Sequence, residues 1–459
     1  MHDLRKKVFE SNKTISRKAR SRQQSGQGSP ASSRAGSRAP SLQPSDDEHS
    51  SDTDWDDGLT VSVANSEYSD DTPPASRSEA LHNHIVDLLD QKRSSVQDRE
   101  VKLAAYAHML RHHPNAAVDE INQQINDLIP LFLKAARGFI TSLETVNAIK
   151  ALTVTILSTE LETAYGRVYP TLKGICQDLD DESVKVAAIR AMSVATMCGG
   201  GGTAEAEELM EFLLDIVETD GHVIEAGDSG PVVAAALDAW GFVASNIDDL
   251  EEESTRALEA FSEQLNSTDV DVQVAAGSNI ALLLEAARVY EDETGEAWNM
   301  RYDQDQLLSQ LAALTKESSK SISKKDRRHL HTSFNSVITS LQHGKGPGYS
   351  TARRLATNPH TGGNKTDFRA DFQEYGYREK LRIQNITILI DTWSLSARVR
   401  MLKSVLGSGL ANHYTDNQVV KGLLSGAHAE YTQSSAQKKN RGDKSSEGGK
   451  RPSRGKGGF

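Results

Sequence analysis

One pattern recurs along this chain and constrains its fold more than any other feature. Each copy places a valine soon after an acidic turn, followed by small and apolar residues at helical spacing. The copies centre on five valines: Val101, Val146, Val184, Val232 and Val272. Their spacings are 45, 38, 48 and 40 residues, close to the ~40–47 residues of HEAT and armadillo arrays, in which each helix pair buries its apolar face against its neighbours. We therefore predict an all-α, armadillo/HEAT-like α-solenoid over residues 81–343, with a non-repetitive helical bundle as the alternative.

Small residues and acidic turns support the repeat. Three copies carry an alanine pair: Ala104 with Ala105, Ala187 with Ala188, and Ala275 with Ala276. Such small side chains let neighbouring helices approach closely. The Asp and Glu residues ahead of the valines are expected to cap the helices and to interact favourably with their positive N-terminal ends.

Charge is distributed unevenly along the chain. Residues 1–45 carry 10 Lys and Arg against 2 Asp and Glu, whereas residues 46–80 carry 1 against 11. The predicted repeats are acidic, since residues 81–319 carry 16 Lys and Arg against 41 Asp and Glu. Residues 320–459 are basic, with 25 Lys and Arg against 10 Asp and Glu. A basic end on an acidic body indicates binding to a polyanion or to a partner protein. The alternative is a solvated helix surface followed by a disordered basic tail.

Both ends of the chain are poor in large apolar residues. We expect residues 1–80, a basic and then acidic Ser-rich leader, and residues 426–459, a basic tail, to be disordered, because they bury too little surface to offset the entropy of ordering. The two cysteines, Cys176 and Cys198, form no CxxC pair. With no run of ~18 apolar residues and no signal-like N-terminus, we expect no membrane segment and a location in the cytoplasm, with the nucleus as a further location.

The region after the repeats is predicted to differ from them. A Gly/Pro-rich stretch indicates a loop over residues 344–365, and residues 366–425 are expected to form a small α+β module. Leu381 and Ile383 alternate with polar residues, and the alternation changes phase at residues 384–385, which indicates β structure with a bulge or tight turn. We expect no other strand. A helix from Ser394 follows, and then a short helix whose capping box is Thr415 with Gln418.

Basic side chains beyond residue 320 are the candidate RNA contacts. Lys324, Lys325, Arg327 and Arg328 begin a predicted helix, where the macrodipole disfavours cations. A polyanion is one explanation for their position and a solvated basic turn is the other. Lys and Arg bound to phosphates release counterions, so such binding weakens steeply with salt. The further candidates are Arg398, Arg400, Lys403, Lys438, Lys439, Arg441, Lys450, Arg451, Arg454 and Lys456.

The sequence carries no signature of catalysis. It lacks HExxH, GxSxG and Walker patterns and any Cys/His set at zinc spacing, so we expect no enzyme, no cofactor, no metal and no small-molecule substrate. His413 and Ser408 lie close in sequence, but no third group is placed to orient them. Gly407 and Gly409 are expected to shape a backbone turn, with His413 capping or packing.

Two runs of sequence are distinctive. One is VLGSGLANHY at residues 405–414, which includes Leu406, and the other is DVDVQVAAGSNIALLLEAAR, followed by a long helix that begins KKDRR. Together they resemble the interferon-related developmental regulator family, over residues 80–425. The resemblance implies a non-enzymatic regulator of gene expression with an armadillo-like body. It also implies either ribosome binding, with a C-terminal element in the RNA path of an idle ribosome, or transcriptional co-regulation through deacetylase-containing complexes.

Two functions therefore compete. The first is translation regulation, in which the basic C-terminal part binds the ribosome or its RNA. The acidic solenoid is then a scaffold for protein partners, because the negative charge of RNA would repel the solenoid. The second is a nuclear co-regulator that holds partner peptides on the concave face of the solenoid. We favour the first, because about half of the cations beyond residue 320 lie in predicted ordered sequence.

Overall fold

The computed structural model describes residues 74–90, 94–115, 118–159, 161–317, 323–355, 372–383 and 386–431. The chain divides into two units, Met1–Ser51 and Asp52–Phe459, and every described residue belongs to the second. Most of the predicted leader and the basic tail beyond residue 431 therefore lie outside the described residues.

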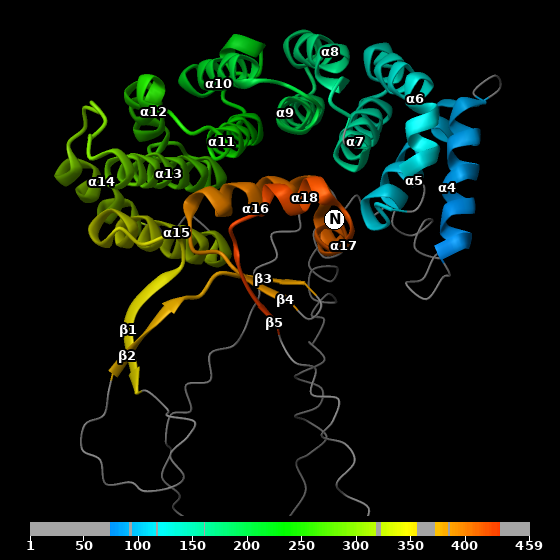
Figure 1. Cartoon of the computed structure of the whole chain (residues 1–459). Coiled ribbons are helices and arrows are strands. Elements are labelled where there is room, and N and C mark those ends of the chain that lie inside the picture. Colours follow the sequence, from blue (N-terminus) through cyan, green and yellow to red (C-terminus); the bar gives the residue numbers. More distant parts are fainter. Residues whose placement is uncertain are drawn as a thin grey trace, which may run out of the picture. The chain divides into compact units, whose positions relative to one another are not determined.

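Helices stacked in two layers form the body of the second unit (Figure 1). The first helices are α4 (Pro74–Leu89), α5 (Val96–His112), α6 (Val118–Gly138), α7 (Ser142–Thr159), α8 (Ala164–Asp178), α9 (Glu182–Cys198) and α10 (Thr203–Glu218). Next come η1 (His222–Ile224), α11 (Gly230–Ala244), α12 (Glu251–Gln264), α13 (Val270–Thr294), α14 (Gln304–Glu317) and α15 (Lys324–His343). The last described helices are α16 (Trp393–Leu406), η2 (Gly407–Gly409), α17 (Leu410–Asp416) and α18 (Gln418–Leu423).

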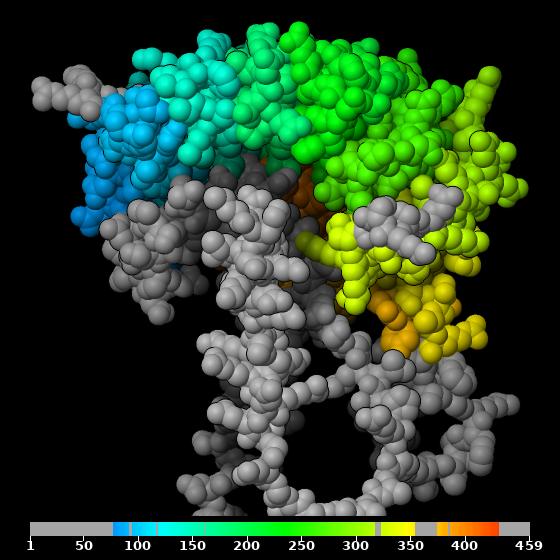
Figure 2. Space-filling model, turned by 180° about the vertical axis from the view of Figure 1, so that it is seen from behind, coloured from blue at the N-terminus to red at the C-terminus, as the bar shows by residue number. Residues whose placement is uncertain are grey.

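The predicted α-solenoid is confirmed. The inner layer is α5, α7, α9, α11, α13 and α15, each packed on the next, while α6, α8, α10, α12 and α14 each pack from outside on the inner helix that follows. Seen from behind, the chain colours run in order across the surface (Figure 2), as expected when each repeat contacts mainly its neighbours.

The repeat valines all lie in inner helices. Val184, Val232 and Val272 are fully buried and Val146 is nearly so, whereas Val101 is 51% exposed. Val101 belongs to α5, at the end of the array, where a repeat lacks one neighbour and departs from the consensus.

The predicted acidic caps are confirmed at two inner helices. Asp181 Oδ1 accepts hydrogen bonds from the N–H groups of Ser183 (2.9 Å) and Val184 (3.1 Å), at the start of α9. Asp269 caps α13 in the same way. At α5 the prediction is wrong, because the helix begins earlier and Ser95 Oγ is the cap.

The C-terminal helices complete this core. α16 packs on α7, α11 and α13, α17 packs on α5, and α18 packs on α7 (Figure 1). Glu285 of α13 caps α16, since its carboxylate accepts from the N–H groups of Trp393 (2.9 Å) and Ser394 (3.1 Å). The described helices of residues 366–425, a range predicted to form a small α+β module, therefore pack against the repeats. The inner layer, on which the co-regulator hypothesis places partner peptides, is covered in part by the protein's own chain.

Strands are more extensive than predicted. They are β1 (Tyr349–Leu355), β2 (Phe372–Tyr377), β3 (Lys380–Ile383), β4 (Ile386–Leu389) and β5 (His428–Tyr431). β1 pairs with β2, and β4 lies between β3 and β5, all antiparallel. The β3–β4 hairpin, with Ile383 opposite Ile386, confirms the predicted β structure at the change of phase.

The other strands correct our expectations. β1 falls in the predicted loop of residues 344–365, and β5 falls in the tail expected to be disordered from residue 426. β5 is a four-residue strand that forms by adding to the free edge of β4, so its own sequence carries little periodic signal. The capping box of Thr415 is also wrong, because Asn417 caps α18 and Thr415 Oγ1 instead donates to Ala411 O.

One described helix, α13, is long and apolar enough by length and composition to cross a membrane. Most of its apolar stretch is buried inside the protein, and α11, α12, α15 and α16 pack on it. Its hydrophobicity is accounted for by its place in the core.

Candidate nucleic-acid interface

The predicted basic turn lies at the start of α15. Ser323 Oγ caps this helix by accepting from the N–H of Asp326 at 3.1 Å. Lys324, Lys325 and Arg328 are exposed, whereas Arg327 is half-buried. The turn thus presents cations to solvent at a helix end that does not favour them.

A second group of cations lies on and beside strands β1 to β3, where our sequence reasoning named no site. Arg353 is in β1 and Lys380 is in β3, whereas Lys345 precedes β1 and Arg378 lies between β2 and β3. Lys345, Arg353, Arg378 and Lys380 are exposed. We call these four residues, with strands β1 and β2, the β arm. It follows the C-terminal end of α15, and a 20-residue helix is ~30 Å long, so the structure does not bring the arm together with the basic turn.

Tyrosines interleave with the cations of the arm. The Arg378 guanidinium lies 4.6 Å from the centre of the Tyr375 ring, and Lys345 Nζ lies 5.4 Å from that of Tyr349. Tyr375 is 45% exposed. Tyr349 donates a hydrogen bond to Glu374 at 2.6 Å and meets Tyr377 edge to face. Exposed aromatic rings beside Arg and Lys are the elements with which proteins stack bases and hold the phosphates of single-stranded RNA.

Two of the predicted RNA contacts are used inside the fold. Arg398 donates to the carbonyl oxygens of Ser245 and Leu423, and burial lowers the pKa of its guanidinium. Arg400 pairs with Asp238 of α11 at 3.1 Å. These partners tie α16 to α11 and α18, so we remove both arginines from the candidate RNA surface. Lys403 is exposed on α16 and stays a candidate.

The segment around Gly407 and Gly409 fastens the C-terminal helices to α5. A Cβ on Gly409 would lie 2.1 Å from the carbonyl oxygen of Arg111, and Gly407 has a φ of +51°. Both positions therefore need glycine. His112 Nε2 lies 3.1 Å from Ser408 Oγ, and neighbouring Leu406 is buried in the core.

His413 is fully buried in this contact and has a packing role, as expected. Its Nε2 lies 3.2 Å from Leu110 O, and Asn417 Nδ2 donates to its Nδ1 at 3.1 Å. A neutral imidazole protonated at Nε2 satisfies both contacts. Desolvation lowers the pKa of His413 to about 4. We call the contacts of residues 407–417 with α5 the clasp.

The tail candidates lie outside the described residues: Lys438, Lys439, Arg441, Lys450, Arg451, Arg454 and Lys456. Within the part of the chain that is described, no group of three or more His, Cys, Asp or Glu side chains is placed to hold a metal ion.

Comparison with known proteins identifies the family. The model of the interferon-related developmental regulator family matches residues 43–342, more than half of the chain. The match covers the repeats and stops short of residues 405–414, on which the sequence resemblance partly rested.

Individual relatives agree with this match. An uncharacterized protein of Schizosaccharomyces pombe is 27% identical over 363 residues, which cover 75% of this chain and 74% of the relative. Interferon-related developmental regulator 2 of Mus musculus is 25% identical over 42% of this chain and 36% of its own length. Interferon-related developmental regulator 1 of Sus scrofa is 22% identical over 45% of this chain and 39% of its own length. Much of the mouse and pig proteins thus lies outside the aligned parts, but the family match is broad, and the chain belongs to the interferon-related developmental regulator family.

Proposed function

We propose that this protein regulates translation without enzymatic activity, by binding the ribosome through RNA contacts of its basic C-terminal part. The acidic solenoid serves in this proposal as a scaffold for protein partners. Family membership supports the broader role, a regulator of gene expression.

The β arm is the observation that carries the proposal. Its cations are exposed, and two of them, Lys345 and Arg378, lie beside tyrosine rings, one of which is itself exposed. Phosphates attract the cations, and a tyrosine face accepts any base, so the arm suits RNA without requiring a particular sequence.

The acidic body favours one orientation on RNA. Residues 81–319 carry 41 acidic against 16 basic residues, so phosphates are repelled from the repeats and attracted to the C-terminal part. Without Arg398 and Arg400, the proposed RNA contacts are the cations of the β arm, Lys403, the cations of the basic turn in α15 and those of the tail sequence.

The alternative, a nuclear co-regulator scaffold, loses part of its structural support. It places partner peptides on the inner face of the solenoid, and there α16 and α17 contact α5, α7, α11 and α13. A nuclear partner would have to bind elsewhere or displace these helices.

Ribosome sedimentation of the full chain tests the proposal. The arm variant carries Arg353→Gln, Arg378→Gln and Lys380→Gln. A matched control variant removes three cations from the repeats: Lys102→Gln, Arg301→Gln and Lys316→Gln. We expect the arm variant to leave the ribosomal fractions and the control to stay in them. Equal sedimentation of the two variants, or migration of the wild type with a nuclear fraction regardless of RNase, would overturn the proposal.

A further inference from the structure

An open groove lies on the outer layer at α6 and α8. It encloses about 540 Å³. Its lining residues are Ile129, Pro130, Leu133, Lys134, Arg137, Gly138 and Arg167. An apolar floor from α6 thus lies beside three cations, in a body that is otherwise strongly acidic.

The cations of the groove have no carboxylate partner among the described residues. Arg137 donates to Thr171, and Arg167 donates to the side-chain oxygen of Asn126 at 3.2 Å. Other cations of the repeats do form ion pairs, as Lys173 does with Glu208. The groove is therefore a positive and apolar site that an acidic, partly apolar ligand would complement.

Exposed apolar side chains extend this surface beyond Gly138. In the turn between α6 and α7, Phe139 is 39% exposed and Ile140 is 59% exposed, and Leu143 in the first turn of α7 is 44% exposed. Phe139 has a φ of +39°, a region that bulky residues rarely adopt. Strained backbone of this kind persists where its surroundings hold it, and it often marks a binding site.

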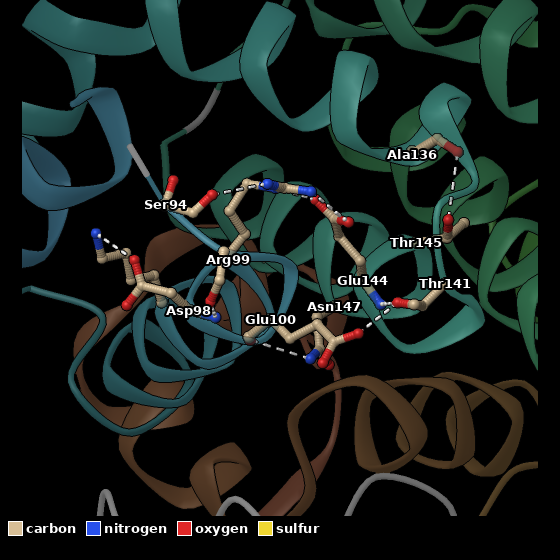
Figure 3. A network of polar contacts seen from close by, with 11 residues as sticks. Ser94, Asp98, Arg99, Glu100, Ala136, Thr141, Glu144, Thr145 and Asn147 are labelled. Carbon is tan, nitrogen blue, oxygen red and sulfur yellow. Dashed lines mark hydrogen bonds and ion pairs between the residues drawn. The ribbon is translucent and has the colours of Figure 1, made fainter. Parts of the chain in front are cut away.

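A polar network holds the turn in this conformation (Figure 3). The buried Glu144 carboxylate accepts from Arg99 Nε at 2.6 Å, and the Glu144 N–H donates to Thr141 Oγ1 at 3.1 Å. Thr141 in turn donates to Glu100, and Asn147 Nδ2 donates to the Glu100 carbonyl at 3.2 Å. α5 thus fixes the end of the turn while its apolar side chains remain in solvent.

We propose that residues 52–71 of the same chain dock on this surface, which we call the α6–α8 surface. This segment has seven acidic residues, no Lys or Arg, and the apolar residues Trp55, Leu59, Val61 and Val63. Both its charge and its apolar content complement the groove. The inference is independent of RNA binding.

The position of the segment favours docking within one molecule. Trp55 precedes Pro74, the first residue of α4, by 19 positions, and an extended chain of that length reaches ~60 Å. α4 itself packs on α5 and α6. Such a tether gives a high effective concentration, so even a weak site is occupied. The family match begins at residue 43 and therefore includes the segment together with the repeats.

Hydrogen exchange of the full chain, read by mass spectrometry, tests the proposal. In the wild type, the amides of residues 52–71 are expected to exchange about tenfold more slowly than in the groove variant Lys134→Glu with Arg137→Glu, which corresponds to a segment docked about nine-tenths of the time. The matched control, Arg301→Glu with Lys316→Glu, keeps the slow exchange. Unchanged exchange of α9 and α11 shows that the variants are folded.

A second variant changes only the segment and leaves the repeats intact. Trp55→Ser with Asp56→Asn and Asp57→Asn is expected to speed exchange in residues 52–71 and in the turn at Phe139 together. Exchange of residues 52–71 at the rate of an unstructured peptide in the wild type would overturn the proposal. Protection that rises with protein concentration would also overturn it, because the occupant would then be a second copy of the chain.

Discussion

The substitution Gly409→Ala tests the clasp with a single added methyl group. The ideal Cβ at this position lies 2.1 Å from Arg111 O and 2.8 Å from the carbonyl carbon of the same residue. Real Cβ atoms stay beyond about 3.0 Å from such atoms, so the backbone of η2 or of α5 must move by roughly 1 Å. No flexible side chain can yield instead, because the obstruction is main chain.

The expected loss of stability follows from the contacts that this backbone shift disturbs. Overpacking of this kind costs about 1–3 kcal/mol. The clasp also contains the hydrogen bonds of Asn412 to His112 O (2.8 Å) and of His413 to Leu110 O (3.2 Å), each worth about 1 kcal/mol net. We expect Gly409→Ala to destabilise the clasp by about 2–4 kcal/mol.

Gly422→Ala is the matched control. Gly422 lies in α18, close to Gly409 in sequence, and a Cβ there would meet nothing within 4 Å. Alanine favours the helix by about 0.5–1 kcal/mol, so this variant is expected to be as stable as the wild type or slightly more stable.

Hydrogen exchange in α17 is the direct readout, because helical arrays can unfold in parts and a global midpoint averages over them. Gly409→Ala is expected to speed exchange in α17 and at the C-terminal end of α5, while α9 stays protected. Wild-type protection of α17 in Gly409→Ala would refute the clasp. So would an equal loss of protection in Gly422→Ala.

Two further predictions concern stability. Arg398→Met leaves carbonyl oxygens in the protein without their donor and is expected to destabilise the protein by about 2–4 kcal/mol. Arg400→Ala breaks a half-exposed ion pair and is expected to cost about 1 kcal/mol or less. Urea unfolding compares the two variants, and equal losses of stability would contradict the structure. His413 and His108 have pKa values lowered to about 4 by burial, so they are neutral in the folded protein and the unfolded chain binds more protons below pH ~6.5. Stability is therefore full above pH ~6.5 and falls as the pH drops toward 4, and a flat unfolding midpoint across this range would contradict the burial of these rings.

The repeats could be predicted because their signal is local and recurs. An alanine pair and an acidic cap lie within a few residues of each valine, and Asp181 and Asp269 carry out the roles that this spacing indicates. The exception, Val101, lies in the first repeat, whose position at the end of the array no local pattern reveals.

The C-terminal part could be predicted only in outline, because its partners are distant in sequence. The helix from Ser394 and the β3–β4 hairpin have the expected periodicity. The role of Arg398 depends on Ser245, which is 153 positions away, and that of His413 depends on Leu110, which is 303 positions away. Nothing in the neighbourhood of either residue separates a packing role from a binding role.

The β arm was missed for a related reason. Arg353 and Arg378 are 25 positions apart in the sequence, and only the pairing of β1 with β2 makes them parts of one arm. The alternation of Tyr375 and Tyr377 around a glycine was a signal for β2, but the strand is too short for periodicity alone to identify it.

The salt dependence of ribosome binding tests the central claim, that exposed C-terminal cations contact RNA. Each phosphate contact contributes about 0.7–0.9 to the slope of log K against log salt concentration. Loss of three of the four arm cations, Arg353, Arg378 and Lys380, is therefore expected to make the slope shallower by about 2. The repeat variant Lys102→Gln, Arg301→Gln, Lys316→Gln is expected to keep the wild-type slope. An arm variant that binds with the wild-type slope and affinity would contradict the account.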